Sequence, residues 1–149
     1  MTTKRLLTTL LLTLLTALST FILVAAQSSE TESSTLADNE KLVIMWTSGD
    51  RDVALKMVFM YAYNAPEYGW WQDVTLIVWG PSAKLLSEDE ELQEYVRKMA
   101  ERGIHFKACK ACADMYGVSD KLTELGVEVR YMGGELTRYI KGDFNVVTF

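Results

Sequence analysis

The pattern of apolar and polar positions from residue 41 onward predicts strands that alternate with helices. KLVIMW (41–46) is a short, almost uninterrupted apolar run, which is typical of a strand buried on both faces. Four further runs have strand character: DVTLIVW (73–79), IHFKA (104–108), VEVRYM (127–132) and FNVVTF (144–149). Strands separated mostly by helices favour parallel pairing with cover on both faces. We therefore expect an α/β fold, a three-layer α/β/α sandwich around a five-stranded, mostly parallel sheet.

Helical spacing and end signals fill the intervals between these runs. After the first strand, Asp50 is a candidate N-cap, and an apolar face follows at Val53, Ala54, Met57, Val58 and Tyr61. Ser87 and Glu90 have the spacing of a capping box. The helix that this box predicts carries Leu92, Tyr95, Val96 and Met99 on one side and ends at Gly103. Shorter helices are expected over Cys109–Tyr116, Ser119–Leu125 and Glu135–Lys141.

The amino-terminal segment predicts export. Lys4 and Arg5 precede a run without charge at 6–26, which ends in small residues suited to signal peptidase. We expect a signal peptide at 1–26, a flexible polar linker at 27–40 and one folded domain at 41–149. An uncleaved anchor is the alternative, because 21 uncharged residues can just span a bilayer. Either alternative places the domain outside the cytoplasmic membrane, in the periplasm or extracellular space, and cleavage would leave no stable membrane contact.

The net charge of the chain bears on which classes of partner the domain is suited to bind. The whole chain carries a net charge of −5, and loss of Lys4 and Arg5 with the signal peptide changes it to −7. An acidic exported domain is unsuited to nucleic acid or to an anionic membrane surface.

Candidate chemistry lies at the carboxyl ends of the predicted strands, where open parallel sheets bind ligands. TSGD (47–50), GPSAK (80–84) and CKAC (109–112) all fall there, and only the last carries thiols. Cys109 is expected at a helix start, where free amides and the helix dipole stabilise a thiolate. Lys107 and Lys110 flank it and add positive potential if they turn toward the sulfur. Cys112 follows one turn later, so the two sulfurs can meet.

Other interpretations of the cysteines stay open. A buried cysteine is often a small apolar residue, and two cysteines in an exported protein often form a structural disulfide. Zinc usually requires four ligands, whereas the chain has two cysteines and the single histidine His105, which is expected at the surface or packed. Ala113 stands where haem attachment requires histidine. No loop matches a phosphate-binding motif, so no metal and no cofactor are predicted.

Three segments together resemble the DsrE-like family of sulfur-relay proteins: ACKACADMYGV (108–118), KLTELGVEVRYMGGELTRYI (121–140) and VVTF (146–149). The resemblance extends over the domain from Lys41. It implies a three-layer sandwich, assembly into homotrimers or hexamers, and a persulfide on the cysteine that follows the third strand. Cys109 stands at that position.

The leading hypothesis is an exported sulfur carrier or sulfurtransferase-like protein. Cys109 would be the nucleophile that carries sulfane sulfur, Cys112 a resolving thiol, and Lys107 and Lys110 electrostatic support. The donor and acceptor would be proteins or small sulfur compounds. One alternative is a thiol–disulfide redox protein that uses the same pair. The other is a non-catalytic oligomeric binding module, whose interface or packed cluster would include Tyr61, Tyr63, Tyr68, Trp70 and Trp71.

Overall fold

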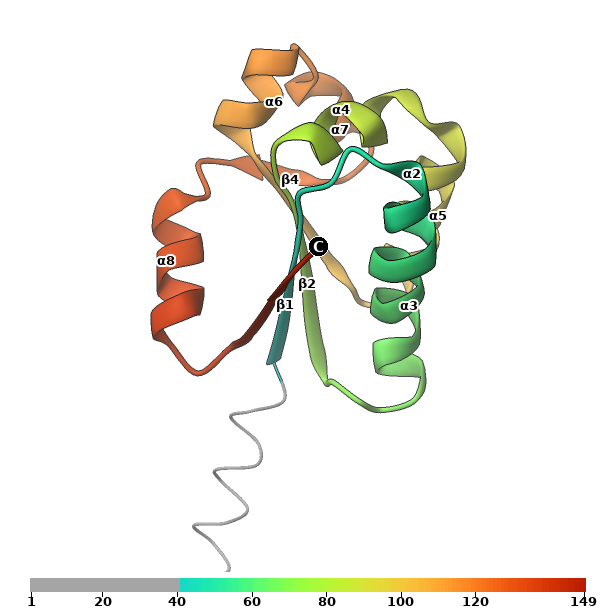
Figure 1. The fold of residues 1–149 in the computed structure, drawn as a ribbon, viewed down its shortest axis with the longest axis vertical. Coiled ribbons are helices and arrows are strands. Elements are labelled where there is room, and N and C mark those ends of the chain that lie inside the picture. Colours follow the sequence, from blue (N-terminus) through green and yellow to red (C-terminus); the bar gives the residue numbers. More distant parts are fainter. Residues whose placement is uncertain (1–40) are drawn as a thin grey trace, which may run out of the picture. The chain divides into compact units, whose positions relative to one another are not determined.

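Five parallel strands form a single sheet in a computed structural model that describes residues 41–149 (Figure 1). The sheet order is β4-β3-β2-β1-β5, and all four strand pairings are parallel. The strands are β1 (Lys41–Trp46), β2 (Asp73–Val78), β3 (His105–Cys109), β4 (Glu128–Arg130) and β5 (Asn145–Thr148). The predicted five-stranded sheet is confirmed. The predicted signal peptide and linker (1–40) lie outside the described residues.

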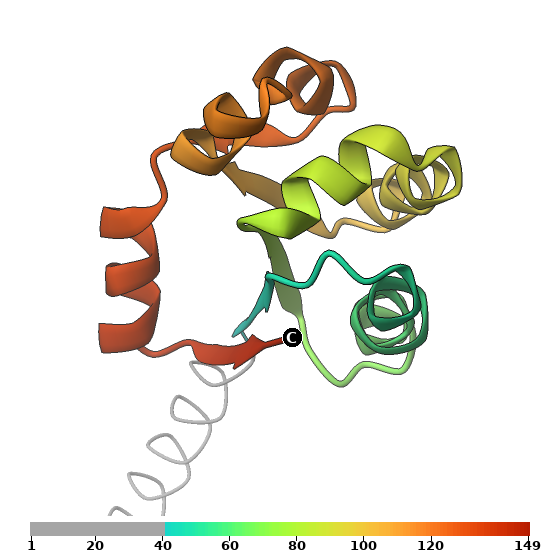
Figure 2. The same cartoon turned by 45° about the horizontal axis from the view of Figure 1, so that its top comes forward.

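The helices are divided unequally between the two faces of the sheet. They are α2 (Arg51–Val53), the π-helix η1 (Ala54–Phe59), α3 (Met60–Glu67), α4 (Pro81–Glu88), α5 (Glu90–Glu101), α6 (Lys110–Tyr116), α7 (Ser119–Glu124) and α8 (Gly133–Lys141). Figures 1 and 2 show α8 on one face and α3 and α5 on the other, with α6 beyond the carboxyl end of β3. Within residues 41–149, no helix is long and apolar enough to cross a membrane.

The larger apolar core lies between the sheet and the layer that contains η1, α3 and α5. Side chains alternate along a strand, so Leu42, Ile44 and Trp46 of β1 all point into this core. Phe59 meets Trp46 edge to face, with ring centroids 5.1 Å apart. Val43 points to the opposite face and joins a smaller cluster below α8. The sheet is therefore apolar on both sides of β1, as its uninterrupted apolar sequence predicts.

The helical segment after β1 starts as predicted but exposes a different set of residues. Asp50 is the N-cap, and its carboxylate accepts hydrogen bonds from the amides of Asp52 and Val53 at 2.8 and 3.1 Å. Met57, expected on the buried face, is 49% exposed, whereas Phe59 is fully buried. The i→i+5 hydrogen bonding of the π-helix gives more residues per turn, so the 3.6-residue spacing assigned the wrong side chain to the core.

The predicted capping box at 87–90 is wrong. Ser87 is a buried residue of α4, and its hydroxyl donates to the carbonyl of Lys84 at 2.7 Å. Asp89 caps α5 instead and accepts from the Leu92 amide at 3.0 Å. Helix α4 was not predicted from the sequence, although Pro81 occupies the first helical turn, where proline is favoured. The buried positions Leu92, Val96 and Met99 of α5 are confirmed, whereas Tyr95, which was predicted on the same side, is exposed.

The fourth strand is shorter than the predicted 127–132. β4 pairs with β3 only over Glu128–Arg130, at the edge of the sheet. Beyond it, Tyr131 is 71% exposed, whereas Met132 turns inward into the small cluster below α8. The chain leaves the sheet here because Met132 packs under α8 rather than continuing the edge strand.

Candidate thiol site

The two cysteines meet at the carboxyl end of β3. Cys109 is the last residue of β3 and the N-cap of α6, and Cys112 lies one helical turn later. Both are free thiols, and the Cys112 Sγ donates a hydrogen bond to the Cys109 Sγ at 3.2 Å. Cys109 is only 5% exposed, whereas Cys112 is half-buried. The structure thus brings the two predicted site residues together.

The environment of Cys112 favours its protonated form. Burial raises the pKa of the Cys112 thiol, and its hydrogen bond to Cys109 raises that pKa further. The backbone amide of Gly80, which also faces the Cys112 sulfur, acts in the opposite direction and lowers it, but the net shift is upward. Cys112 therefore holds its proton and directs it at Cys109, so the Cys109 sulfur is the acceptor of the pair.

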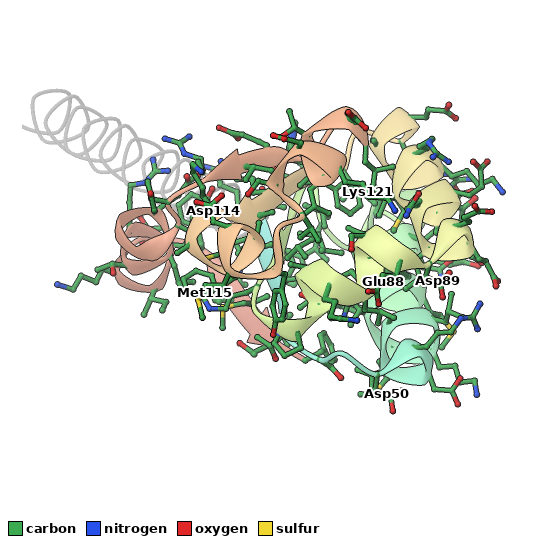
Figure 3. All side chains as sticks on the ribbon, turned by 90° about the horizontal axis from the view of Figure 1, so that it is seen from above. Asp50, Glu88, Asp89, Asp114, Met115 and Lys121 are labelled. Carbon is green, nitrogen blue, oxygen red and sulfur yellow. The ribbon has the colours of Figure 1, made fainter. Side chains whose placement is uncertain are left out.

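The loops that follow β1 and β2 lie beside the thiol pair. Gly80, at the start of the GPSAK segment, provides the amide that faces Cys112. Gly49 of the TSGD segment packs against Pro81, and a Cβ at position 49 would lie 3.1 Å from the Pro81 Cβ. The three loops are therefore neighbours, as expected for the carboxyl edge of a parallel sheet. Figure 3, which views this edge from above, shows Asp114 and Met115 projecting outward from α6.

Cys109 belongs to the smaller apolar cluster, on the α8 face of the sheet. Its buried neighbours there are Val43, Ile77, Met132 and Tyr139. Met132 immediately precedes α8, and Tyr139 lies on it. The packing of α8 against the sheet therefore forms one wall beside Cys109.

A partly buried charge network fastens α8 to β3. The Glu135 side chain of α8 is only 7% exposed; it pairs with Lys107 of β3 and accepts a 2.7 Å hydrogen bond from the Tyr139 hydroxyl. The Lys107 Nζ also donates to the Tyr139 hydroxyl at 3.2 Å. On its other side, the Glu135 Oε2 lies 3.2 Å from the Arg130 Nε, an ion pair without hydrogen-bond geometry. Lys107 and Cys109 share one face of β3, so this network lies directly below the thiol site.

Hydrogen bonds and charge interactions keep both Lys107 and Glu135 in their charged forms. Burial alone raises the pKa of the Glu135 carboxyl, but the hydrogen bonds from Lys107 and Tyr139 outweigh it, and that pKa is lowered overall. Burial likewise opposes the charged form of Lys107, yet its bonds to Glu135 and Tyr139 leave its pKa raised. Glu135 and Tyr139 were not predicted from the sequence as site residues. Their i, i+4 spacing on a predicted helix was the available signal, but it does not reveal a partner 28 residues away on β3.

The second predicted supporting lysine points along α6. The Lys110 Nζ pairs with the Asp114 carboxylate at 2.7 Å and lies 5.9 Å from the centre of the Tyr131 ring. Both predicted lysines thus have carboxylate partners, and their electrostatic support of Cys109 stays a prediction. His105 is exposed near the amino end of β3, away from the thiols, as expected for a surface histidine.

No group of three or more His, Cys, Asp or Glu residues within residues 41–149 has an arrangement that could hold a metal ion.

Aromatic side chains gather at the other edge of the molecule, near β5. The Trp70 ring stacks on both Tyr61 and Tyr68, with ring centroids 5.8 and 5.3 Å away, respectively. Tyr68 and Trp70 are 66% and 52% exposed, whereas Tyr61, Tyr63 and Trp71 pack partly against the large core. The cluster therefore combines packing with an exposed aromatic surface.

The fold and the site define a class of protein: a parallel α/β/α sandwich with a free thiol pair at the carboxyl end of its third strand. The chain belongs to the DsrE/DsrF-like family, whose sequence profile matches residues 40–149. No curated protein matches the chain.

Two solved structures have the same fold. A conserved protein of unknown function, BT1422 from Bacteroides thetaiotaomicron, is 39% identical, with a TM-score of 0.72 over 74% of this chain and 96% of that one. The ychN protein from E. coli shares the fold at 20% identity, with a TM-score of 0.58 over 74% of this chain and 99% of that one. Membership of the family indicates a function related to sulfur relay.

Proposed function

We propose that this protein is an exported sulfur carrier that holds sulfane sulfur as a persulfide on Cys109. The single observation that carries the proposal is the 3.2 Å contact in which the Cys112 thiol donates to the Cys109 sulfur. A protonated neighbour at this distance stabilises negative charge on Cys109, and the thiolate is the nucleophilic form of cysteine. Lys107 adds a positive charge on the same face of β3, and Lys110 adds one on the next residue.

The proposed cycle has two transfers. The Cys109 thiolate attacks the outer sulfur of a donor persulfide, the donor S–S bond breaks, and the donor leaves as a thiolate while Cys109 becomes a persulfide. In the productive transfer, an acceptor thiolate attacks the outer sulfur of Cys109 and restores the Cys109 thiolate. Without an acceptor, Cys112 attacks the inner Cys109 sulfur, which releases hydrosulfide and leaves a Cys109–Cys112 disulfide. The Cys112 proton leaves with the hydrosulfide, and the outer sulfur takes up the electron pair of the broken S–S bond, so the sulfane sulfur itself is the oxidant.

The test is intact-mass analysis of alkylated protein after exposure to inorganic polysulfide, followed by peptide mapping. We expect one added sulfur on Cys109 in the wild type, none in Cys109→Ser, and a longer-lived adduct in Cys112→Ser. Each substitution removes one sulfur atom, so the comparison separates loss of the carrier thiol from loss of the resolving thiol. Equal sulfur loading of wild type and Cys109→Ser would contradict the proposal. A donor-resistant Cys109–Cys112 disulfide would favour the redox or structural alternatives.

Export is a separate part of the proposal. It rests on the basic start, the uncharged run at 6–26 and the small residues before Gln27. Cell fractionation with amino-terminal sequencing of the native protein tests it. We expect a mature chain that begins at Gln27 outside the cytoplasmic membrane. An intact amino terminus on a membrane-bound protein would support the anchor alternative, and one on a cytoplasmic protein would exclude export.

Self-association is also proposed, through the exposed aromatic surface of Tyr68 and Trp70. Two apolar hollows of about 290 and 420 Å³ adjoin this surface, and Tyr61 and Phe149 line both of them. Aromatic side chains and apolar hollows on one surface are typical of interface cores. Light scattering after size exclusion should show a trimer or hexamer that Trp70→Glu dissociates. Glu67→Gln, an exposed change nearby, is the control. A monomeric wild type at micromolar concentration would contradict this proposal.

A further inference from the structure

An open groove lies mostly on the α8 side of the sheet, at the amino ends of β2, β3 and β4, and it extends around this end of the sheet to Val96 and Ala100 of α5. Its volume is about 680 Å³, and its floor includes Asp73, Thr75, His105 and Lys107, with Arg138 and Tyr139 of α8 among the lining residues. The register of the sheet pairs Thr75 with His105, so both strands direct these side chains to the same face. The size of the groove suits a small molecule.

Three of the polar groups that line the groove have unused bonding capacity. The Asp73 Oδ1 is buried and has no hydrogen-bond partner within the described structure. His105 makes no side-chain hydrogen bond or ion pair within residues 41–149. Arg138 is exposed and has one ion-pair contact, at 3.5 Å to Glu135. A buried acceptor without a donor is costly, so the Asp73 carboxylate in particular calls for a ligand donor.

The charged side chains that line the groove exclude a ligand whose charges are all positive or all negative. A simple anion would face the carboxylates of Asp73 and Glu128, and a simple cation would face Lys107 and Arg138. Lys107 and Glu128 are already paired, at 3.6 Å between Nζ and Oε2. The groups left to recognise a ligand are therefore one carboxylate, one guanidinium and one imidazole. This set complements a ligand that carries both an ammonium and a carboxylate.

We propose that the groove binds a small zwitterion, an α-amino acid or a short peptide, with its ammonium at Asp73 and its carboxylate at Arg138 and His105. Lys107 closes the end of the groove toward Cys109. Two residues on one face of a strand are about 7 Å apart, and Tyr139 both lines the groove and packs in the cluster that contains Cys109. If the proposed function holds, the ligand is an α-amino acid or short peptide that carries a thiol. The groove then selects the small-molecule donor or acceptor of sulfur.

The test is calorimetric binding of S-methylcysteine and of S-methylglutathione to the full chain. These probes are an amino acid and a short peptide whose sulfur is blocked, so no covalent chemistry intervenes, and the tighter of the two identifies the ligand class. We expect Asp73→Asn and Arg138→Gln each to weaken binding about tenfold or more, since each removes a charge-assisted hydrogen bond. Arg97→Gln is the matched control, because Arg97 also pairs with a glutamate three residues earlier on a helix.

A probe without an ammonium group tests whether the ligand ammonium binds Asp73. N-acetyl-S-methylcysteine lacks the ammonium, and we expect it to bind the wild type about tenfold more weakly than S-methylcysteine. The same comparison in Asp73→Asn should show a much smaller difference, because the partner is already lost. An undiminished difference in Asp73→Asn would overturn the assignment.

The outcomes separate this inference from the proposed function. Absence of binding to both probes, or binding that neither Asp73→Asn nor Arg138→Gln weakens, would overturn the groove as a zwitterion site. Neither result affects the loading of Cys109 by inorganic polysulfide, which tests the carrier function by itself. Conversely, binding that persists in Cys109→Ser would support the groove even if that variant and the wild type load sulfur equally.

Discussion

The two faces of the sheet are built on different principles. The face below η1, α3 and α5 is covered by a large apolar cluster that includes Trp46, Phe59, Leu92 and Met99. The face below α8 has a small apolar cluster around Cys109, and charged side chains of β3, β4 and α8 cover much of the rest. Figure 2 shows the helices that cover the two faces: α3 and α5 lie together on one side of the sheet, and α8 lies on the other.

This difference separates stability from chemistry. Apolar burial is non-directional, so the large cluster stabilises the fold without demanding exact partners. The α8 face depends on specific pairs such as Lys107–Glu135, in which the loss of one partner leaves the other uncompensated. Cys109 and most of the groove lined by Asp73, His105 and Arg138 lie on that face. Changes to the two faces should therefore affect different measurements.

The largest effect on stability is expected from Phe59→Ala on the apolar face. Phe59 is fully buried against Trp46, so its truncation leaves a cavity and should lower the free energy of unfolding by about 3–5 kcal/mol. Urea unfolding measures the loss. Sulfur loading of the fraction that stays folded should be unchanged. A loss below about 1 kcal/mol would show that this core repacks readily.

Glu135→Gln on the α8 face should lower the free energy of unfolding by about 2 kcal/mol, because it leaves the charges of Lys107 and Arg130 partly uncompensated. Urea unfolding with Glu94→Gln as the control provides the comparison. Glu94 pairs with Arg97 and Lys98 at the exposed surface of α5, so its change should cost about 0.5 kcal/mol or less. Equal losses in the two variants would contradict the special role of the network.

The free energy of unfolding at acidic pH should also depend on the Glu135 carboxylate. The pKa of Glu135 in the folded protein lies below its ordinary value of 4.5. Its contribution is therefore fully present above about pH 4.5 and is lost as the pH falls through the lowered pKa. Stability should thus fall less steeply below pH 4.5 in Glu135→Gln than in the wild type. Parallel acid limbs in urea melts of the two proteins would contradict this expectation.

The smallest expected effect is a shift in the titration of Cys112. Cys109→Ala removes the hydrogen bond that helps to raise the pKa of Cys112, whereas burial, the larger cause, remains. The pKa of Cys112 should therefore move down toward its ordinary value of 9.0 without reaching it. The rate of iodoacetamide labelling as a function of pH measures it in Cys109→Ala, with peptide mapping to resolve Cys112 in the wild type. An unchanged pKa would mean that the hydrogen bond does not persist in solution.

Local patterns predicted most of the fold. Apolar runs located all five strands, because a buried strand needs apolar side chains at consecutive positions. Asp50 was correctly identified as an N-cap. Errors arose where two local signals compete or where tertiary packing decides. Ser87 and Asp89 are both good N-cap residues, and the helix that ends at Glu88 determines which of them is used. The π-helix changed the register of buried side chains, so Met57 became exposed.

The sequence by itself determined the thiol pair and its place after the third strand, because both follow from spacing along a few consecutive residues. The tertiary structure decided which elements surround that pair. Only the sheet register and the packing of α8 place Lys107 against Glu135, and only they align Asp73 with His105 and Arg138 around one groove. These partners are far apart in the chain, and periodicity carries no information about contacts between distant segments.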